Sequence, residues 1–400
     1  MGQLWAGIDS GKTHHHCVVI DGDGRRLLSR RFANTEDEIL ALLASVVELG
    51  GDTQVVWATD LNQGGAALLI GVLLAHGQEL LYIPGRTVHH AARSYRGDGK
   101  TDAKDAAIIA DQARMRRDLR RVRAGDQIAS ELRLLGAHRF DLAADKTRTI
   151  NRMRATMLEY FPALEAAFDY AHKRVALRLL TKYQTPAGIR RAGVNRIGAW
   201  LVKQGHRTGA TIAAAAVEAA QQQHIQVPVE EVAALIVARL AAEVLQIEER
   251  IAAVDAEIEA RLRQHEQAEI ILSVPGFGPT LAAEFIAATG GTANQYDSAD
   301  RLAGIAGVAP VPRDSGRISG NLHRPKRFDR RLLRACYIAA QTAARCHPES
   351  RAYYERKRAE GKNHKQAVLA LARRRVNVIY ALLRDNTTYQ HPAPLVTQAA

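Results

Sequence analysis

The sequence has no long hydrophobic run and few cysteines. No apolar stretch approaches the roughly 18 residues of a membrane-spanning helix, and the first residues lack the apolar segment of a signal peptide. The three cysteines, Cys17, Cys336 and Cys346, form no Cys-x-x-Cys pair. This argues against a disulfide framework and against a zinc site. The composition therefore indicates a protein of the reducing cytoplasm.

Two kinds of motif are also missing. No Gly-x4-Gly-Lys-Ser/Thr loop is present, so ATP-driven chemistry is not expected. No homeodomain or zinc-finger pattern is present through which a protein reads base sequence directly. What the chain does have is 400 residues, of which 47% are apolar. That is enough for two or three domains with hydrophobic cores.

Positive charge is concentrated in one region. The formal net charge is +13. Residues 301–375 hold 19 Lys and Arg against five Asp and Glu, a net of +14, so this window alone accounts for the excess of the whole chain. A solvated basic face is one interpretation. The predominance of Arg favours another, binding to nucleic-acid phosphate, because a guanidinium binds phosphate through two parallel hydrogen bonds.

Residues 1–125 are predicted to form an α/β domain. Three antiparallel strands come first, and alternating helices and strands follow. This is the order of a ribonuclease-H-like fold, although the alternation alone also fits other α/β folds. The expected strands cover residues 4–9, 15–21, 26–32, 54–59 and 80–84.

The rest of the chain is predicted to be helical. Residues 126–268 form a helical region with a coiled-coil seam from Leu240 to Leu262, where apolar residues recur every three or four positions. The seam fits pairing within the chain, pairing between subunits, or packing inside a bundle. Residues 269–385 form a mostly helical domain that begins near a helix-hairpin-helix-like turn at Pro275–Pro279. Residues 386–400 are expected to be a disordered tail.

Four carboxylates are the strongest chemical signal. Asp9 and Asp60 each end an apolar run that is predicted to be a buried strand. Asp102 and Asp105 lie three residues apart where a helix is predicted to begin, so they share one helix face. Each acid alone could be a turn or helix-cap residue. Together they predict a site for a divalent cation, because clustered carboxylates repel one another without one.

A second chemical signal lies in the basic region. Ser315 and Ser319 each precede a glycine on a loop rich in Pro, Gly and Arg. A serine among arginines is a candidate nucleophile toward a phosphodiester, because the arginines stabilise charge that develops on the phosphoryl oxygens. Most loop serines are simply polar turn residues. Residue chemistry alone does not separate the two serines.

In combination these motifs resemble the DEDD-type transposases of the IS110 family of insertion sequences. The resemblance lies in the acid after the first strand, the acid near position 60 and the Thr-Asp-x-x-Asp pair at 101–105. It also lies in the Ala-Gly-x-Ala-Pro block at 306–310, which precedes a Ser-Gly pair and an Arg-Arg-Leu-Leu-Arg helix. It covers about residues 3–160 and 270–345.

The resemblance implies a fold and a set of functional residues. It implies a RuvC-like N-terminal nuclease domain, a coiled-coil middle and a C-terminal transposase domain. It places Mg²⁺ at Asp9, Asp60, Asp102 and Asp105 and makes Ser315 the nucleophile. The family commonly has Glu where this chain has Asp60, so the shorter side chain must approach the metal more closely. It also often has Gly where Phe328 stands.

The sequence is therefore interpreted as a DNA transposase that cuts and rejoins the ends of its own mobile element. The resemblance implies a dimer or tetramer and a structured guide RNA encoded by the element, in the cytoplasm of a bacterium, associated with the nucleoid. The alternatives are a Mg²⁺-dependent junction nuclease that uses water, and a non-catalytic nucleic-acid-binding assembly protein. The cations expected to bind nucleic acid are Arg313, Arg317, Arg324, Lys326 and Arg327.

Overall fold

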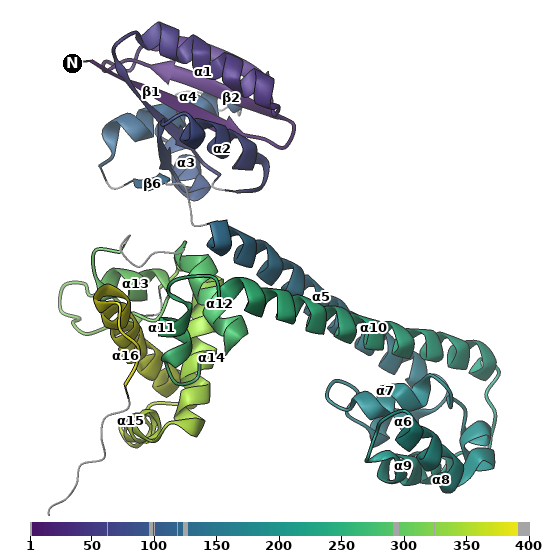
Figure 1. Cartoon of the computed structure of the whole chain (residues 1–400). Helices are drawn as coiled ribbons and strands as arrows, with labels where there is room; N and C mark the ends of the chain where they lie inside the picture. Colours follow the sequence, from purple (N-terminus) through teal and green to yellow (C-terminus); the bar gives the residue numbers. More distant parts are fainter. Residues whose placement is uncertain are drawn as a thin grey trace, which may run out of the picture. The chain divides into compact units, whose positions relative to one another are not determined.

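The computed structural model describes residues 2–61, 63–95, 99, 101–117, 119–122, 127–290, 296–323 and 325–390. The chain divides into two units, Met1–Gly125 and Asp126–Ala400, and each unit has hydrophobic cores of its own (Figure 1). The first unit is α/β and contains the main sheet, and the second is almost entirely helical. Within the described ranges, none of the helices has the length and apolar character needed to cross a membrane.

The first unit is built on one six-stranded sheet with the strand order β3-β2-β1-β4-β5-β6. The central strand β1 pairs antiparallel with β2 and parallel with β4. The predicted strands are present in the predicted order, with the short β6 added at the far edge. The strands are β1 (Gln3–Ser10), β2 (His14–Ile20), β3 (Arg26–Ala33), β4 (Gln54–Thr59), β5 (Glu79–Tyr82) and β6 (Arg120–Val122).

Helices cover both faces of this sheet (Figure 1). On one face, Leu4, Ala6 and Ile8 of β1 share a core with α1 (Glu36–Gly50) and α2 (Ala67–Ala75), which follows the 3-10 turn η1 (Gly64–Ala66). On the other face lie α3 (Gly85–Ala92) and α4 (Asp102–Met115). Because side chains alternate along a strand, Asp9 projects from the α4 face.

A pair of long helices runs through the second unit. Helix α10 (Glu230–Leu262) packs along α5 (Gln127–Leu158), and the seam residues Val244, Ile258 and Leu262 are buried. Ion pairs between Arg139 and Asp255, and between Lys146 and Glu248 (2.7 Å), fix the antiparallel register. The seam is therefore closed within the chain, and its buried residues are not available as the dimerisation surface that the sequence left open.

The middle of the chain forms more than a coiled coil. Helices α6 to α9 pack on one another and on the ends of α5 and α10, with a core that includes Phe161, Leu180 and Ile197. The sequence suggested irregular helices here and gave no sign of a separate core. The helices are α6 (Pro162–Ala167), α7 (Arg174–Leu180), α8 (Pro186–Lys203) and α9 (Gly209–Gln221).

The C-terminal part packs six helices around a core shared with the ends of α5 and α10. It also contains one short hairpin, β7 (Val311–Pro312) and β8 (Leu322–His323). The helices are α11 (Ala268–Ser273), α12 (Pro279–Thr289), α13 (Ala299–Ile305), α14 (Arg330–Cys346), α15 (Pro348–Ala359) and α16 (His364–Asp385). The domain boundary predicted at residue 268 stays a prediction.

The turn expected at Pro275–Pro279 lies between α11 and α12. Its Gly276 has φ +89° and lies against the backbone of α14 near Ala339, so the turn packs inside this unit. In the segment expected to be a disordered tail, the N–H of Tyr389 donates to Ser273 Oγ at 2.8 Å and its ring contacts His347, and the disorder stays a prediction. Residues 391–400 of that tail lie outside the described residues.

Candidate functional site

Two of the four predicted acids lie at one edge of the sheet. The register pairs Ile8 of β1 with Thr59 of β4, so Asp9 and Asp60 follow at the same level on neighbouring parallel strands. The carboxylate of Asp60 reaches across to β1, where Ser10 N–H lies 3.4 Å from its Oδ1. Asp60 is thus tied to the end of β1, and its role as a metal ligand stays a prediction.

The other two acids arrive on α4, and a glycine determines where this helix lies. Gly7 of β1 is so close to Ala106 and Ala110 that a Cβ on it would lie well inside 3.0 Å of their backbone atoms. Asp102 and Asp105 occupy the first turn of α4, next to this contact. Thr101 caps the helix by accepting from Lys104 N–H at 3.2 Å, so neither acid is used as the N-cap.

The charges of the acids on β4 and α4 act on one another. Burial raises the pKa of the Asp60 carboxyl, hydrogen bonds from backbone N–H groups oppose the rise, and the charge of Asp105 adds to it. On the neighbouring strand, burial lowers the pKa of His16, and the charge of Asp102 opposes that shift. His16 is paired in register with Asp9. Negative charge from three elements thus converges on the end of β1.

The four carboxylates have the chemistry of ligands for a hard divalent cation. Their side chains are not arranged around a common point. Carboxylate oxygens are the ligands that Mg²⁺ prefers, and the mutual repulsion of Asp60 and Asp105 is what a cation relieves. Among the described residues, no three His, Cys, Asp or Glu side chains are close enough to form a ready metal site. Asp9 and Asp60 follow neighbouring strands at one edge of the sheet, and Asp102 and Asp105 lie in the first turn of the helix that packs on β1.

Replacing Asp60 with asparagine is expected to raise the melting temperature of the protein slightly at neutral pH in the presence of EDTA. The folded protein holds the Asp60 proton more tightly than the unfolded chain does, so its stability falls as pH rises through the raised pKa. Asparagine removes this pH dependence and can still accept from Ser10 N–H. Thermal melts from pH 4 to 8 test this, with the exposed Asp52→Asn as control. A lower melting temperature for Asp60→Asn at neutral pH contradicts it.

The predicted nucleophile stands at the tip of the hairpin in the second unit. Ser315 and Ile318 exchange backbone hydrogen bonds of 3.2 and 2.9 Å around a two-residue turn, and Gly316 supplies the positive φ of +52° that the turn requires. Ser315 is exposed. Within the described part of the chain, its hydroxyl has no hydrogen-bond partner and therefore no base to activate it.

The base of the hairpin is closed by an aromatic ring. Gly307 has φ +69°, and a Cβ on it would lie 2.6 Å from Cγ of Phe328. Phe328 thus packs on the backbone that leads into the hairpin. The Phe328 side chain packs at the base of the hairpin, and the tip of the hairpin is exposed.

The cations predicted around the serine are exposed. Arg313, Arg317, Lys326 and Arg327 lie on the surface, and across the described ranges none of them forms an ion pair. Arg324 lies outside the described residues. Unpaired guanidinium groups on an exposed hairpin are available to phosphate. The acids and the serine belong to different units, and each group is described here within its own unit.

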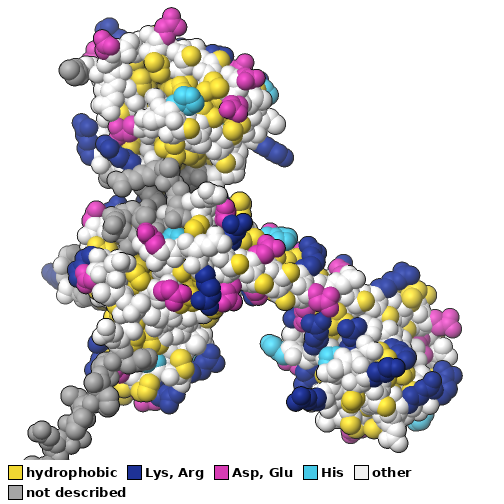
Figure 2. All heavy atoms as spheres, in the orientation of Figure 1, with side chains coloured by type: hydrophobic (Ala, Val, Ile, Leu, Met, Phe, Trp, Pro, Cys, Tyr) yellow, Lys and Arg dark blue, Asp and Glu magenta, His cyan; other side chains and the backbone are white. Residues whose placement is uncertain are grey.

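Sequence reasoning missed two features. Ser10 and Thr59 are buried next to the acids, and their hydroxyls are hydrogen-bonded at 2.9 Å. A second basic surface covers α6–α9, where Figure 2 shows Lys and Arg side chains gathered. Residues 162–229 hold nine Lys and Arg against three Asp and Glu. Counting charges only in the strongly basic residues 301–375 overlooks this surface. Acidic residues elsewhere in the chain cancel its positive charge in the total.

Comparison with known proteins identifies the family. A family model for DEDD transposases of IS110 elements, described as "Transposase", matches residues 6–162, and the model "Transposase IS116/IS110/IS902 family" matches residues 268–355. The IS900 insertion-element 42 kDa protein of Mycobacterium paratuberculosis is 60% identical over 99% of both chains. The IS116 insertion-element 44.8 kDa protein of Streptomyces clavuligerus is 48% identical over 100% of this chain and 98% of its own.

Solved structures were matched as well, and RuvC is among them. T. thermophilus RuvC in complex with a Holliday junction substrate is 17% identical, with a TM-score of 0.23, over 30% of this chain and 99% of that chain. This likeness is too weak to carry an argument. The sequence matches decide the matter, because they run through both units and include the acids and the serine hairpin. The chain belongs to the IS110/IS116/IS902 family of transposases.

Proposed function

We propose that this transposase cuts and rejoins DNA with the acids of the first unit and Ser315 of the second. The observation that carries the proposal is the convergence of carboxylates from β1, β4 and α4 on one sheet edge. A ribonuclease-H-like nuclease domain is consistent with the strand order and with β2 running antiparallel to β1. The exposed hairpin supplies a serine nucleophile, which a nuclease that attacks with water does not need.

The proposed reaction is a transfer of the phosphodiester to the protein and back. The Ser315 oxygen forms a bond to phosphorus, its proton passes to a carboxylate of the acid edge, and one sugar oxygen leaves and takes up a proton. The product is a phosphoserine ester, which keeps the energy of the original bond. The reverse attack by a sugar hydroxyl of another strand rejoins the DNA, so no ATP is consumed.

The residues have distinct roles in this scheme. Arg313 and Arg317 flank Ser315 and bind the phosphoryl oxygens as negative charge develops on them. Asp9, Asp60, Asp102 and Asp105 would hold a divalent cation, which we take to be Mg²⁺. The bound cation would supply positive charge to the scissile phosphate and favour the ionised form of the attacking hydroxyl.

The active site is assembled from parts. Ser315 has no base beside it among the described residues, so activation must come from groups that the hairpin meets when the enzyme acts. We infer that the acids meet it within one chain or across a dimer or tetramer.

The resemblance to the family also supports an element-encoded guide RNA as partner, in a bacterial cytoplasm close to the nucleoid. The basic surfaces over α6–α9 and residues 301–375 offer the charge that such partners need.

Covalent capture on wild-type protein tests this function. The protein, with the nucleic acid that co-purifies with it, is incubated with end-labelled element-end DNA and Mg²⁺ and then denatured. We expect a DNA-linked protein on the gel that EDTA prevents. Sequencing of the co-purified nucleic acid should return a structured RNA from the element. Free cut ends without any linked protein indicate hydrolysis by water instead.

Replacing Asp105 with asparagine is expected to lower the yield of linked protein by roughly 100-fold or more, because a first-turn acid of the cluster loses its charge. Asp111→Asn is a demanding control on the same helix, since Asp111 binds Arg114 and Tyr95 and takes no part in the cluster. Melting temperatures of both variants check the fold. Equal yields from Asp105→Asn and wild type would remove Asp105 from the metal site.

A further inference from the structure

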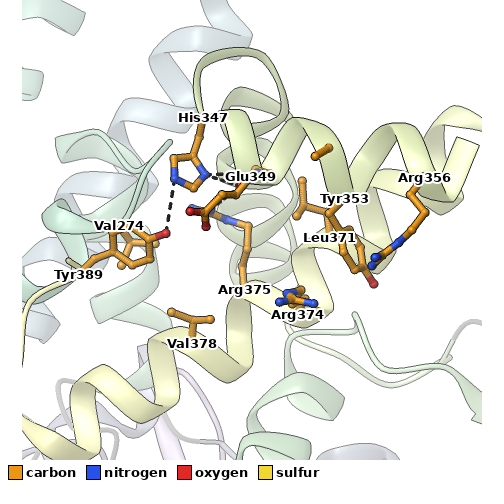
Figure 3. Close-up of a pocket in the computed structure, with 12 residues that line it drawn as sticks. Val274, His347, Glu349, Tyr353, Arg356, Leu371, Arg374, Arg375, Val378 and Tyr389 are labelled. Carbon is orange, nitrogen blue, oxygen red and sulfur yellow. Dashed lines mark hydrogen bonds between the residues drawn. The ribbon is translucent and has the colours of Figure 1, made fainter. Parts of the chain in front are cut away.

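The C-terminal part contains a pocket that the proposed chemistry does not use. It has a volume of about 400 Å³ and lies between α15, α16 and the turn that follows α11. Figure 3 shows three arginines, Arg356, Arg374 and Arg375, around it together with the ring of Tyr353. Its one lining carboxylate is Glu349, and within the described ranges Glu349 forms no ion pair with any of the three. The pocket therefore has a positive excess.

Arg375 is the unusual residue of this pocket. It interrupts the buried apolar stripe of α16 that includes Leu371 and Ile379, and it is only 8% exposed. Its guanidinium donates to the carbonyl of Pro275 and lies 3.4 Å from Ser350 Oγ, while its Nε has no hydrogen-bond partner. Burial lowers the pKa of Arg375 to about 10, so the group stays charged at neutral pH.

A buried charge of this kind needs an anion. Arg375 makes no ion pair within the described part of the chain, and its two neutral partners compensate little of the cost of removing it from water. The hydrogen bond to Pro275 explains how Arg375 anchors the α11–α12 turn. It does not explain the unpartnered Nε or the cations that line the same cavity.

The other two arginines are arranged around one aromatic ring. The guanidinium carbons of Arg356 and Arg374 lie 5.0 and 5.2 Å from the ring centroid of Tyr353. Both are exposed, and neither forms an ion pair across the described residues, so the ring holds them nearby without neutralising them. Preoriented guanidinium groups at the mouth and a buried one at the back are suited to a multiply charged oxyanion.

We propose that this pocket binds a phosphate group of a nucleic-acid strand. The cavity is larger than a phosphate alone requires, and the remaining space suits the adjoining sugar and base, which can stack on the planar groups at its mouth. The proposal rests on the proposed function only in taking nucleic acid as the partner. It adds a contact on α15 and α16, away from the serine hairpin.

Binding to short labelled single strands, DNA and RNA in separate arms, tests this in the full-length protein without divalent cations. We expect Arg375→Met to weaken binding about tenfold and to reduce the slope of log affinity against log salt by about one, measured between roughly 50 and 200 mM NaCl. Arg356→Ala with Arg374→Ala should have a similar effect. Arg358→Ala is the matched control, an exposed arginine on α15 that does not line the pocket.

The outcomes decide between strand phosphate and other sources of the anion. Unchanged affinity and salt slope in the Arg356/Arg374 double variant overturn the proposal, as does an equal loss in Arg358→Ala. Because both double-variant sites are exposed, this readout stays valid if Arg375→Met does not fold. Inorganic phosphate that raises the melting temperature through Arg375, with no change in strand binding, assigns the pocket to a free anion and also overturns it. No step of this assay needs Ser315 or the acids, so failure of the proposed chemistry leaves it intact.

Discussion

Replacing Ser315 with alanine is expected to abolish the covalent protein–DNA product and to reduce strand transfer by roughly 1,000-fold or more. The reason is chemical, because alanine lacks the oxygen atom that Ser315 would bond to phosphorus. The fold should be unaffected, since the side chain is exposed and makes no hydrogen bond within the described part of the chain. Denaturing gels for linked DNA and a strand-transfer assay measure the loss, and thermal melts confirm the fold.

Ser319 provides the matched control for this prediction. It lies on the same exposed hairpin and precedes a glycine in the same way, so Ser319→Ala makes the same chemical change four residues away. We expect Ser319→Ala to retain at least half of the wild-type transfer. A reversed result would assign the nucleophile to Ser319. Full transfer by both variants would disprove the serine mechanism.

The second large effect is expected at Gly7, far from any nucleophile. Gly7→Ala places a methyl group against the backbone of Ala106 and Ala110, where no side chain can move aside. Either the sheet distorts or α4 lifts away, at a cost of about 3 kcal/mol or more. Because α4 carries Asp102 and Asp105, the same change should also separate the acids and remove activity. The urea unfolding transition of the first unit measures the stability, and covalent capture of DNA measures the activity.

Gly71 is the control for this substitution. It lies in α2, and a Cβ there would meet nothing within 4 Å. Gly71→Ala should therefore stabilise the protein by up to about 1 kcal/mol, as alanine does at an exposed helix position. If Gly7→Ala unfolds at the same urea concentration as wild type, then α4 does not lie against β1 as described, and the convergence of the acids loses its support.

The acid edge could be predicted because strand periodicity and parallel pairing are local rules. Apolar runs that end at Asp9 and Asp60 indicate two buried strands, and neighbouring parallel strands end at a common edge. The glycine in the first strand signals a close approach by another part of the backbone. The sequence does not say that α4 makes this approach, because that depends on how the helix crosses the sheet.

The features that escaped prediction depend on tertiary contacts. The heptad spacing of α10 fits a partner in the same chain or in another subunit equally well, and only the ion pairs with α5 decide. Arg375 did leave a sequence signal, since a charged residue interrupts an otherwise apolar helical stripe. Such an interruption usually means a solvated edge, and burial had to be observed before it indicated a pocket. The core of α6–α9 is assembled from short helices whose individual patterns are weak.

The unpartnered hydroxyl on the hairpin has a consequence for the host cell. A serine that carries its own base is reactive whenever the protein is folded, and a DNA-cutting protein of that kind would damage chromosomes in proportion to its abundance. Here the hydroxyl stays protonated and unreactive at neutral pH while it is exposed to water. Under the proposed chemistry, an element can therefore accumulate its transposase between rare events without harming the genome that carries it.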